Sequence, residues 1–327
     1  MPEVRIDYLT EDIVTIAEER ANRPHFFKHE THSGKQFTEY TEGCPFCPEN
    51  SHMLPDPIYV SQNGRVIVVP NKYPAFSENG SGYGFHEVII DTPRHTQKFN
   101  EFSEQEISGV LSAIQSRLNY YRTLKRIKYV QIIKNDGRSA GASIYHSHWQ
   151  IFAMDFVPNK QRLIHTNLHN YRRELNSCFL CDIQKNEGTL KIYENAGFFA
   201  YSPYASLYPN MVQILPKEHI SDFADFDGKA INSLSEILKK AVNALNILMD
   251  DVSFNICFQN APYDSPDEKY KCGHFFIQLI PRISNFAGFE LSTGCFINMV
   301  KPEKSCLKMK EIINGYSKMM PKLEDEL

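Results

Sequence analysis

The sequence HSHWQIF at residues 146–152 has a counterpart, HFFIQLI, at residues 274–280. Each segment begins with a histidine and carries a glutamine four residues later, at Gln150 and Gln278. Both are short apolar runs of the kind that form buried β-strands. A segment that occurs twice in one chain is the first sign of an internal repeat, so the rest of the chain can be compared in the same frame.

The correspondence between the two halves extends outward from these segments. Each half opens with a Cys-x-x-Cys pair and continues with two strand-like segments, a helix-like stretch and a third strand-like segment before the histidine segment. In the first half these lie at residues 44–47, 65–70, 86–95, 103–124 and 129–135; in the second they lie at residues 178–181, 198–203, 211–219, 230–249 and 254–260. The nearly constant offset between corresponding residues indicates an ancient duplication.

Strands arranged around one long helix predict an α+β fold with a mostly antiparallel sheet in each half. We therefore expect two tandem repeats that resemble each other, an N-terminal domain at residues 1–160 and a C-terminal domain at residues 161–327. The polar segment at residues 155–177 is expected to join them. A C-terminal helix is expected at residues 302–320, where Pro302 suits its first turn.

Composition excludes several classes of protein. The 327 residues are 42% apolar, which is ordinary for a globular chain, and 35 basic against 39 acidic residues give a net charge of −4. This balance argues against nucleic-acid binding, which leaves a basic footprint. No stretch reaches the ~18 apolar residues of a membrane span, and the first thirty residues lack a signal peptide's apolar core. We expect a cytoplasmic protein with no membrane partner.

Four of the eight cysteines form the two Cys-x-x-Cys pairs, and each pair is followed by two histidines at matching offsets. Two thiolates and two imidazoles suit a closed, tetrahedral, structural Zn²⁺ site. Buried thiols with unrelated histidines, or a redox motif, would leave the recurrent histidines unexplained. We expect two structural zinc sites per chain, one formed by Cys44, Cys47, His95 and His146, the other by Cys178, Cys181, His219 and His274.

His148 is the candidate nucleophile. On a strand with a period of two residues, His146, His148 and Gln150 would lie on one face. A neutral imidazole can attack an α-phosphorus without losing a proton, and Gln150 could donate to a bridging oxygen. The competing interpretation is a further metal ligand or an ordinary strand histidine. In the second half Phe276 replaces His148, so we expect one such site per chain.

The segment KNDGRSAGAS at residues 134–143 lies immediately upstream of the two histidines. Gly137 and Gly141 allow a close backbone approach, successive N–H groups can surround an anion, and Asn135 and Ser143 add side-chain donors. Alone, such a segment is usually an ordinary turn. Its position before His-x-His-x-Gln predicts a phosphate-binding loop.

Taken together, these segments resemble the galactose-1-phosphate uridylyltransferase branch of the histidine-triad superfamily. The resemblance covers nearly the whole chain and is closest to the sub-branch that contains plant ADP-glucose phosphorylase. It rests on ERANRP, CPFC, NKYPAF, GFHEVIIDTPRH, KNDGRSAGASIYHSHWQ and GFELSTGCFIN, at residues 19–24, 44–47, 71–76, 84–95, 134–150 and 288–298.

The resemblance implies two-step nucleotidyl transfer with His148 as the nucleophile. It implies zinc at both Cys/His sets, a nucleotide-sugar and a sugar phosphate or phosphate as substrates, and a homodimer. For Arg20 and Arg23, an ordinary solvated helix end remains an equal interpretation. The implied substrate-binding residues are Arg20, Arg23, Asn71, Tyr73, Asn135, Gly141, Ser143, Phe289 and Glu290.

Two departures leave the substrate open. Members of the well-studied uridylyltransferase branch carry proline where this chain has Ser147, and they build the second metal site from other residues. The leading hypothesis is transfer from UDP-glucose to a hexose-1-phosphate. Phosphorolysis of ADP-glucose, nucleotide hydrolysis and a non-catalytic zinc scaffold are the alternatives. Histidine-triad hydrolases usually have a third histidine at the position of Gln150, and glutamine is no general acid, which favours transfer.

Overall fold

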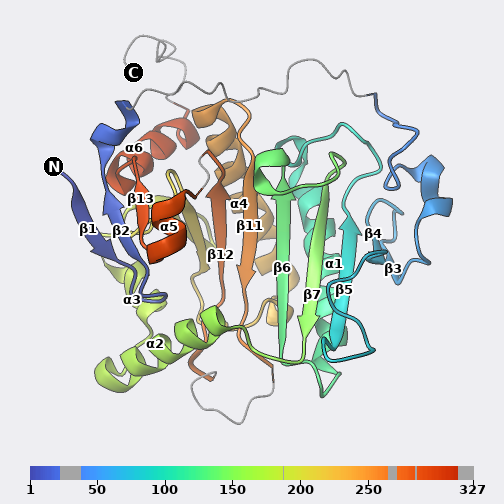
Figure 1. Cartoon of the computed structure of the whole chain (residues 1–327), viewed down its shortest axis with the longest axis horizontal. Coiled ribbons are helices and arrows are strands. Elements are labelled where there is room, and N and C mark those ends of the chain that lie inside the picture. Colours follow the sequence, from blue (N-terminus) through green and yellow to red (C-terminus); the bar gives the residue numbers. More distant parts are fainter. Residues whose placement is uncertain (23–37, 187, 264–270, 284–285, 316–327) are drawn as a thin grey trace.

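A computed structural model of the chain describes residues 1–22, 38–186, 188–263, 271–283 and 286–315 (Figure 1). Within these residues, ten strands form one sheet in the order β3-β4-β5-β7-β6-β11-β12-β10-β9-β8, and every neighbouring pair is antiparallel. The strands are β3 (Tyr59–Val60), β4 (Ile67–Pro70), β5 (Gly84–Ile90), β6 (Tyr129–Asp136), β7 (His148–Met154), β8 (Lys191–Glu194), β9 (Phe198–Tyr201), β10 (Val212–Pro216), β11 (Phe254–Gln259) and β12 (Phe276–Pro281). The predicted α+β fold with a mostly antiparallel sheet is confirmed.

Corresponding strands of the two halves occur in the same order when each half of the sheet is followed inward from its own edge. One edge gives β3, β4, β5, β7 and β6, and the other gives β8, β9, β10, β12 and β11. The two series meet where β6 pairs with β11. Because one sheet runs across the chain's midpoint, the division into domains at residues 160 and 161 stays a prediction.

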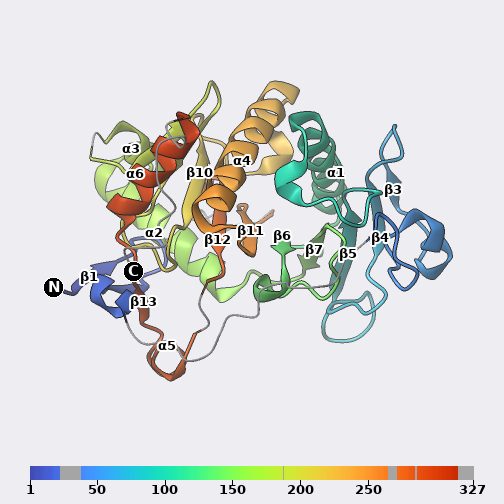
Figure 2. The same cartoon turned by 90° about the horizontal axis from the view of Figure 1, so that it is seen from above.

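Two long helices cover one face of the sheet and pack against each other (Figure 2). Helix α1 (Glu104–Arg122) begins with a capping box in which Ser103 and Glu106 each accept from the other's backbone N–H. Helix α4 (Gly228–Met249) begins at Asp227, whose carboxylate accepts from Ala230 N–H. Both helices bury apolar residues in one large core with the strands, as their periodic patterns predict.

On the opposite face of the sheet, helices cover strands of the second half (Figure 1). Over β9, β10 and β12 lie α2 (Asn159–Leu175) and α3 (Phe179–Lys185), with a second apolar cluster beneath them. Residues 155–177, expected only to join the halves, therefore contain a helix. Its residues Ile164 and Leu168, one turn apart, are buried in that cluster. Packing of this apolar stripe explains why a polar segment folds as a helix.

A separate three-stranded sheet lies beside the second half (Figure 1). It consists, in the described residues, of β1 (Glu3–Ile6), β2 (Ile13–Ile16) and β13 (Phe296–Asn298), with β13 parallel to β2. The short helix α5 (Gly288–Thr293) precedes β13, and α6 (Pro302–Ile313) packs on α4. Helix α6 ends before the predicted residue 320, and residues 316–320 lie outside the described residues. No helix of the described residues is both long and apolar enough to cross a membrane.

Candidate active site

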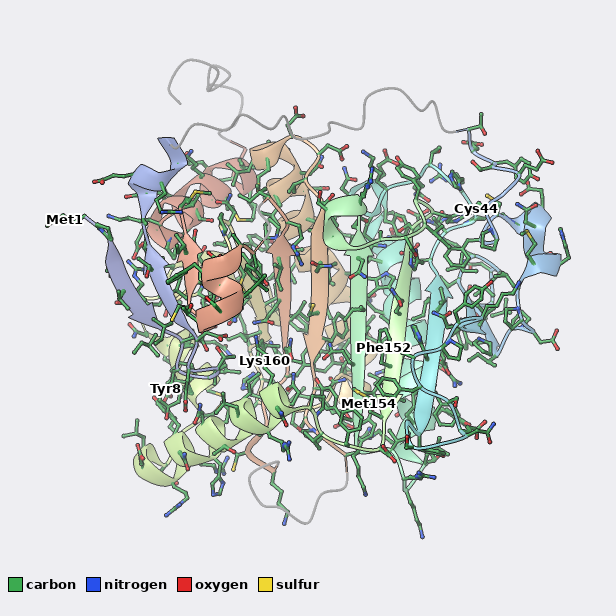
Figure 3. All side chains as sticks on the ribbon, in the orientation of Figure 1. Met1, Tyr8, Cys44, Phe152, Met154 and Lys160 are labelled. Carbon is green, nitrogen blue, oxygen red and sulfur yellow. The ribbon has the colours of Figure 1, made fainter. Side chains whose placement is uncertain are left out.

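His148 and Gln150 lie on the face of β7 opposite α1 and α4, whereas Trp149 between them is buried in the main core. Figure 3 marks Phe152 and Met154 further along this strand and Cys44 near its beginning. Strand β7 starts at His148, so His146 precedes the strand and the three side chains are not in one strand register. The expectation that His146 belongs to the strand was therefore wrong. His146 lies outside the strand because its ring contacts the two cysteines described below.

The ring of His148 is held by the main chain. Its Nδ1 lies 2.8 Å from the carbonyl oxygen of His146, to which it donates, so Nε2 keeps its lone pair. The ring is 5% exposed and packs edge-on against Phe46, with ring centroids 5.1 Å apart. Burial lowers the pKa of His148, and the nearby Lys134 ammonium lowers it further. A neutral imidazole with a free Nε2 is the form that can act as a nucleophile.

Gln150 is oriented by His86 on the neighbouring strand β5. The Nδ1 of His86 accepts from Ala75 N–H at 3.1 Å, and its Nε2 donates to Gln150 Oε1 at 2.9 Å. Burial lowers the pKa of His86, which favours this neutral form. Asn71 Nδ2 is 3.1 Å from the same Nε2. With its oxygen occupied, Gln150 presents its NH₂ group as a donor toward the open face.

The loop after β6 has the backbone geometry that small residues allow. Gly137 has φ +83°, and a Cβ there would lie 2.2 Å from Ser253 Oγ, while Gly141 has φ +87°. Asn255 on β11 donates to Asn135 Oδ1 at 2.7 Å and to the carbonyl of Ala140 at 2.8 Å. The second half of the chain thus fixes both the start and the turn of this loop. Ser143 is exposed at its end.

The first cysteine pair lies beside the start of β7. Cys44 Sγ is 3.7 Å from His146 Nδ1, and Cys47 Sγ is 3.5 Å from His95 Nδ1 and 3.8 Å from His146 Nδ1. All four side chains are buried, and burial raises the pKa of Cys44 to about 11. His146 Nε2 donates to the carbonyl of Thr92 at 2.7 Å, so Nδ1 faces the thiols.

The second cluster repeats this arrangement in the other half. Cys178 Sγ and Cys181 Sγ are each 3.4 Å from His274 Nδ1, and Cys181 Sγ is 3.4 Å from His219 Nδ1. His274 Nε2 lies 3.4 Å from the carbonyl of Pro216, a contact like that of His146 Nε2 with the carbonyl of Thr92. This cluster is more open, because Cys181 is half-buried and His219 is exposed.

Both clusters fit a tetrahedral metal ion. In each, the four ligand atoms lie within 4.8 Å of one another. With metal–sulfur bonds of about 2.3 Å and metal–nitrogen bonds of about 2.1 Å, tetrahedral ligands are roughly 3.6 Å apart. The sulfur–nitrogen distances given above lie close to this value. The two predicted ligand sets can therefore hold metal ions, and a fully occupied set leaves no position for a substrate.

Other predicted residues lie away from His148. Tyr73 is 82% exposed in the loop after β4. Arg20 is exposed in a 3₁₀ turn at Glu18–Asn22. Phe289 and Glu290 are on α5, which lies with the three-stranded sheet beside β12, whereas β7 is beyond β11 and β6 (Figure 1). Arg23 lies outside the described residues.

The sequence did not indicate five residues that contact the site. Phe46 and His86 contact His148 and Gln150, Asn255 contacts the loop, and Lys134 and Asp91 lie directly behind Ser147. One signal was available for Lys134. It follows Val130 and Ile132 in the core-facing register of β6, where a lysine is out of place.

Comparison with known proteins agrees with this architecture. A family model described as a domain of unknown function (DUF4921) matches residues 83–319. ADP-glucose phosphorylase from Arabidopsis thaliana is 31% identical over 95% of this chain and 93% of its own length. Galactose-1-phosphate uridylyltransferase from Thermotoga maritima is 24% identical over 82% of this chain and 89% of its own.

Solved structures show the same fold. The crystal structure of an Arabidopsis thaliana ADP-glucose phosphorylase with bound ADP-glucose superposes with a TM-score of 0.86 and 29% identity, over 95% of this chain and 99% of that one. A uridylyltransferase structure, 22% identical, has a TM-score of 0.74 and covers 96% of this chain and 99% of its own. With one relative matching nearly end to end at 31% identity, the chain belongs to the galactose-1-phosphate uridylyltransferase-like family of nucleotidyltransferases, which includes ADP-glucose phosphorylase.

Proposed function

We propose that the chain moves a nucleoside monophosphate from a nucleotide-sugar to a phosphate-bearing acceptor through a covalent intermediate on His148. The observation that carries the proposal is the ring of His148 itself. Its Nδ1 donates a hydrogen bond to the carbonyl of His146, its Nε2 keeps a lone pair, and burial favours the neutral form of the ring. No other described histidine combines these features with a neighbouring glutamine amide and a glycine loop.

In the first step, His148 Nε2 attacks the α-phosphorus of the nucleotide-sugar and forms a P–N bond. The bond from that phosphorus to the bridging oxygen breaks, and its electrons leave with the sugar 1-phosphate. In the second step, a phosphate oxygen of the acceptor attacks the same phosphorus. The P–N bond then breaks, and neutral His148 is restored. Since the leaving phosphate is already stable as an anion, no general acid is required, and an amide at Gln150 suffices.

Polar groups around His148 can stabilise the charge that develops on the α-phosphate. We assign the NH₂ group of Gln150, the NH₂ group of Asn135 and the hydroxyl of Ser143 to its oxygens. The backbone N–H groups near Gly141 belong to the same cradle. Asn71 and Tyr73, in the loop after β4, are proposed to line the nucleotide pocket. Asn71 Nδ2 lies 3.1 Å from His86 Nε2, and Asn71 Oδ1 accepts from the backbone N–H of Tyr73, which supports this assignment.

The leading candidate reaction uses UDP-glucose as donor and galactose-1-phosphate as acceptor, as the names of several relatives suggest. A second candidate is ADP-glucose with inorganic phosphate as acceptor. One specific observation favours it, because a plant ADP-glucose phosphorylase is 31% identical along 95% of this chain. The first chemical step is the same in both reactions, so the acceptor decides between them.

We propose Zn²⁺ as the ion for both Cys/His clusters. Four thiolate and imidazole ligands suit zinc, which would brace the start of β7 and its counterpart without taking part in the transfer. The proposal includes a cytoplasmic location, since a reducing compartment keeps such thiols available to a metal.

A homodimer completes the proposal. Helix α5 presents exposed Phe289 and Leu291 beside the three-stranded sheet, which itself exposes Val4 and Ile6. Exposed apolar side chains such as these support an interface on this side of the molecule. We propose that Phe289, Glu290 and Arg20 of one subunit contribute to the sugar-phosphate end of the site in the other.

The proposal is tested by incubating the protein with UDP-glucose or ADP-glucose labelled in the α-phosphate. Wild type is expected to retain acid-labile label, and His148→Gly to retain none while keeping both zinc ions. His169→Gly on α2 is the matched control and should label normally. Absence of label on wild type with every nucleotide-sugar, or full turnover by His148→Gly, would contradict the proposal.

The labelled enzyme then identifies the acceptor. Release of label as a nucleotide-sugar on adding galactose-1-phosphate indicates uridylyltransferase activity. Release as a nucleoside diphosphate on adding inorganic phosphate indicates phosphorolysis. Release at the same rate in plain buffer indicates hydrolysis and would rule out the proposed transfer.

A further inference from the structure

Directly behind the candidate nucleophile lies a polar network in the main core. Lys134 Nζ donates to Ser147 Oγ at 2.6 Å and to Asp91 Oδ2 at 3.0 Å, and Ser147 Oγ donates to the same Asp91 oxygen at 3.0 Å. Lys134 and Asp91 are fully buried and Ser147 is 7% exposed. We call these three residues the lysine network. They lie on the helix-facing side of the sheet, opposite the side that presents His148.

The lysine network is poorly explained by stability. A buried ion pair must overcome the loss of hydration of both charges, and apolar replacements of similar volume are often equally stable or more stable. Asp91 Oδ1 is buried with no hydrogen-bond partner among the described residues, which adds to this cost. Around the Lys134 ammonium there are also Asp136, whose Oδ2 is 3.8 Å away, and the rings of Phe99 and Trp149, at 5.0 and 5.6 Å.

The second half of the molecule shows that the fold does not require such a network. By strand register, Phe258 on β11 takes the place of Lys134, since it pairs with Ile277 as Lys134 pairs with Trp149. Phe275 takes the place of Ser147, and both phenylalanines are fully buried. Pro216 takes the place of Asp91, since it lies two residues after Ile214, which pairs with Ile277 as Ile89 pairs with Trp149. The half with Phe276 in the nucleophile position has only apolar residues at these three positions.

A chain of contacts leads from the lysine network to the nucleophile. The hydroxyl of Ser147 is fixed by two partners, so the peptide that joins His146 to Ser147 is fixed as well. The carbonyl of that peptide is the group that accepts from His148 Nδ1. Lys134 Nζ also lies 3.4 Å from the carbonyl oxygen of His148. Movement of Ser147 would therefore turn the ring that must face the α-phosphorus.

We infer that the lysine network positions the imidazole of His148 for attack, acting through the peptide between residues 146 and 147. This inference rests on the proposed function, and it makes Lys134, Asp91 and Ser147 positioning residues that never touch the substrate. In-line attack depends steeply on placement, and a misplacement of about 1 Å can cost roughly 100-fold in rate.

The test replaces residues of the lysine network with apolar residues, as in the second half. Lys134→Met combined with Asp91→Leu is expected to keep both zinc ions and to unfold at the same temperature as wild type or higher. Its single-turnover rate of nucleotidyl transfer to His148 is expected to fall about 10- to 100-fold, with little change in KM. Ser147→Ala removes the hydroxyl that contacts Lys134 and Asp91, with the smallest change in volume. The same loss of rate is expected, with a nearly unchanged melting temperature.

The matched control disrupts a second buried network in the same half. Arg117 on α1 donates to Glu87 on β5 at 2.6 and 2.9 Å, and neither residue contacts His148 in the described structure. Glu87→Leu combined with Arg117→Met is expected to leave the single-turnover rate unchanged. A loss of rate as large as that of the lysine-network variant would show that any buried polar substitution slows the enzyme and would overturn the inference.

A second readout does not depend on activity. Long-range ¹H–¹⁵N spectra of the histidine rings are expected to show His148 in wild type as one neutral tautomer protonated at Nδ1. In the lysine-network variants this signal is expected to broaden or to include the Nε2-protonated form. Wild-type rate together with an unchanged His148 signal in Ser147→Ala would overturn the inference. If wild type accepts no nucleotide-sugar, the proposed function fails, and the histidine spectrum alone then decides the positioning role.

Discussion

The two halves share one strand order and one arrangement of cysteines and histidines, yet they differ where β7 and β12 begin. In the first half, His148 is followed along an open face by Gln150, and a buried lysine lies behind it. In the second half, Phe276 is buried beneath α2 and α3 with Leu168 and Leu180. The two Cys/His clusters therefore belong to the common scaffold, whereas the polar residues that we propose for the chemistry occur in one half only.

The largest effect is expected from breaking the scaffold in each half. Structural zinc contributes roughly 10–16 kcal/mol, comparable to a domain's whole stability, so losing one ligand should remove several kcal/mol. His146→Ala and His274→Ala are both expected to lower the melting temperature strongly and to release one zinc ion. Only His146→Ala should also abolish nucleotide labelling of the folded fraction, because loss of the proposed metal ligand frees the backbone whose carbonyl holds His148.

Metal analysis and thermal unfolding of these two variants check that expectation. Treatment of wild type with a chelator provides the control, and zinc should leave first from the second cluster, where His219 is exposed. Equal loss of labelling in both variants would contradict the division between scaffold and chemistry.

Exchange of the residues at the start of β7 and β12 tests the comparison directly. His148→Phe is expected to lower turnover by more than about 1000-fold, the scale on which removal of a nucleophile acts. Phe276→His is expected to create no second labelled site and to lower the free energy of unfolding by about 1–3 kcal/mol, because the imidazole would be buried in an apolar cluster. Label counting and denaturant unfolding measure the two results, and two labels per Phe276→His chain would contradict them.

Much of this arrangement could be predicted from the sequence, because it depends on local patterns. Cysteine and histidine spacing predicted both clusters, and alternation predicted that His148 and Gln150 share a face. The helix at α2 was missed because its apolar residues are few, and Leu168 becomes informative only once the sheet beneath it is known. The contact of Asn255 with Asn135 joins residues far apart in sequence. It depends on the register between β6 and β11, which no single segment specifies.

Asn255 joins the two halves, because it lies on β11 in the second half and its side chain donates to the loop of the first. Its side chain is 8% exposed, and Arg282 donates to its Oδ1 at 3.1 Å. Asn255→Ala is expected to free Asn135 and the carbonyl of Ala140, and to lower kcat/KM about 10-fold, or ~1.4 kcal/mol in transition-state stabilisation. Steady-state kinetics measure this change. Asn195→Ala, in a loop of the second half, is the control, and a similar loss there would contradict a specific role.

The last effect concerns stability alone, at the residues before two matching 3₁₀ turns, Lys98 before Phe99–Glu101 and Asp222 before Phe223–Asp225. Burial raises the pKa of Asp222 to about 6, despite the backbone N–H of Ala224 and the guanidinium of Arg122. A carboxyl whose pKa is higher in the folded state stabilises the fold when protonated. That contribution is complete below the unfolded pKa near 4 and is lost as the pH rises through 6.

Asp222→Asn keeps the cap on Ala224 N–H and removes the charge. It is expected to raise the free energy of unfolding at pH 7.5 by about 1–3 kcal/mol, and this gain should shrink as the pH falls below 6. Denaturant unfolding between pH 4 and pH 8 measures the dependence. Asp225→Asn, an exposed neighbour bound to the same arginine, should show no such dependence. A constant gain at every pH would contradict burial as the cause.

Covalent catalysis by His148 is measured most directly by the mass of the intact chain after mixing with a nucleotide-sugar in the absence of acceptor, followed by peptide mapping. We expect one nucleoside monophosphate per chain, attached to Nε2 of His148, and none on the peptide that contains Phe276. An unmodified chain with every nucleotide-sugar, or a modification at any other residue, would contradict it.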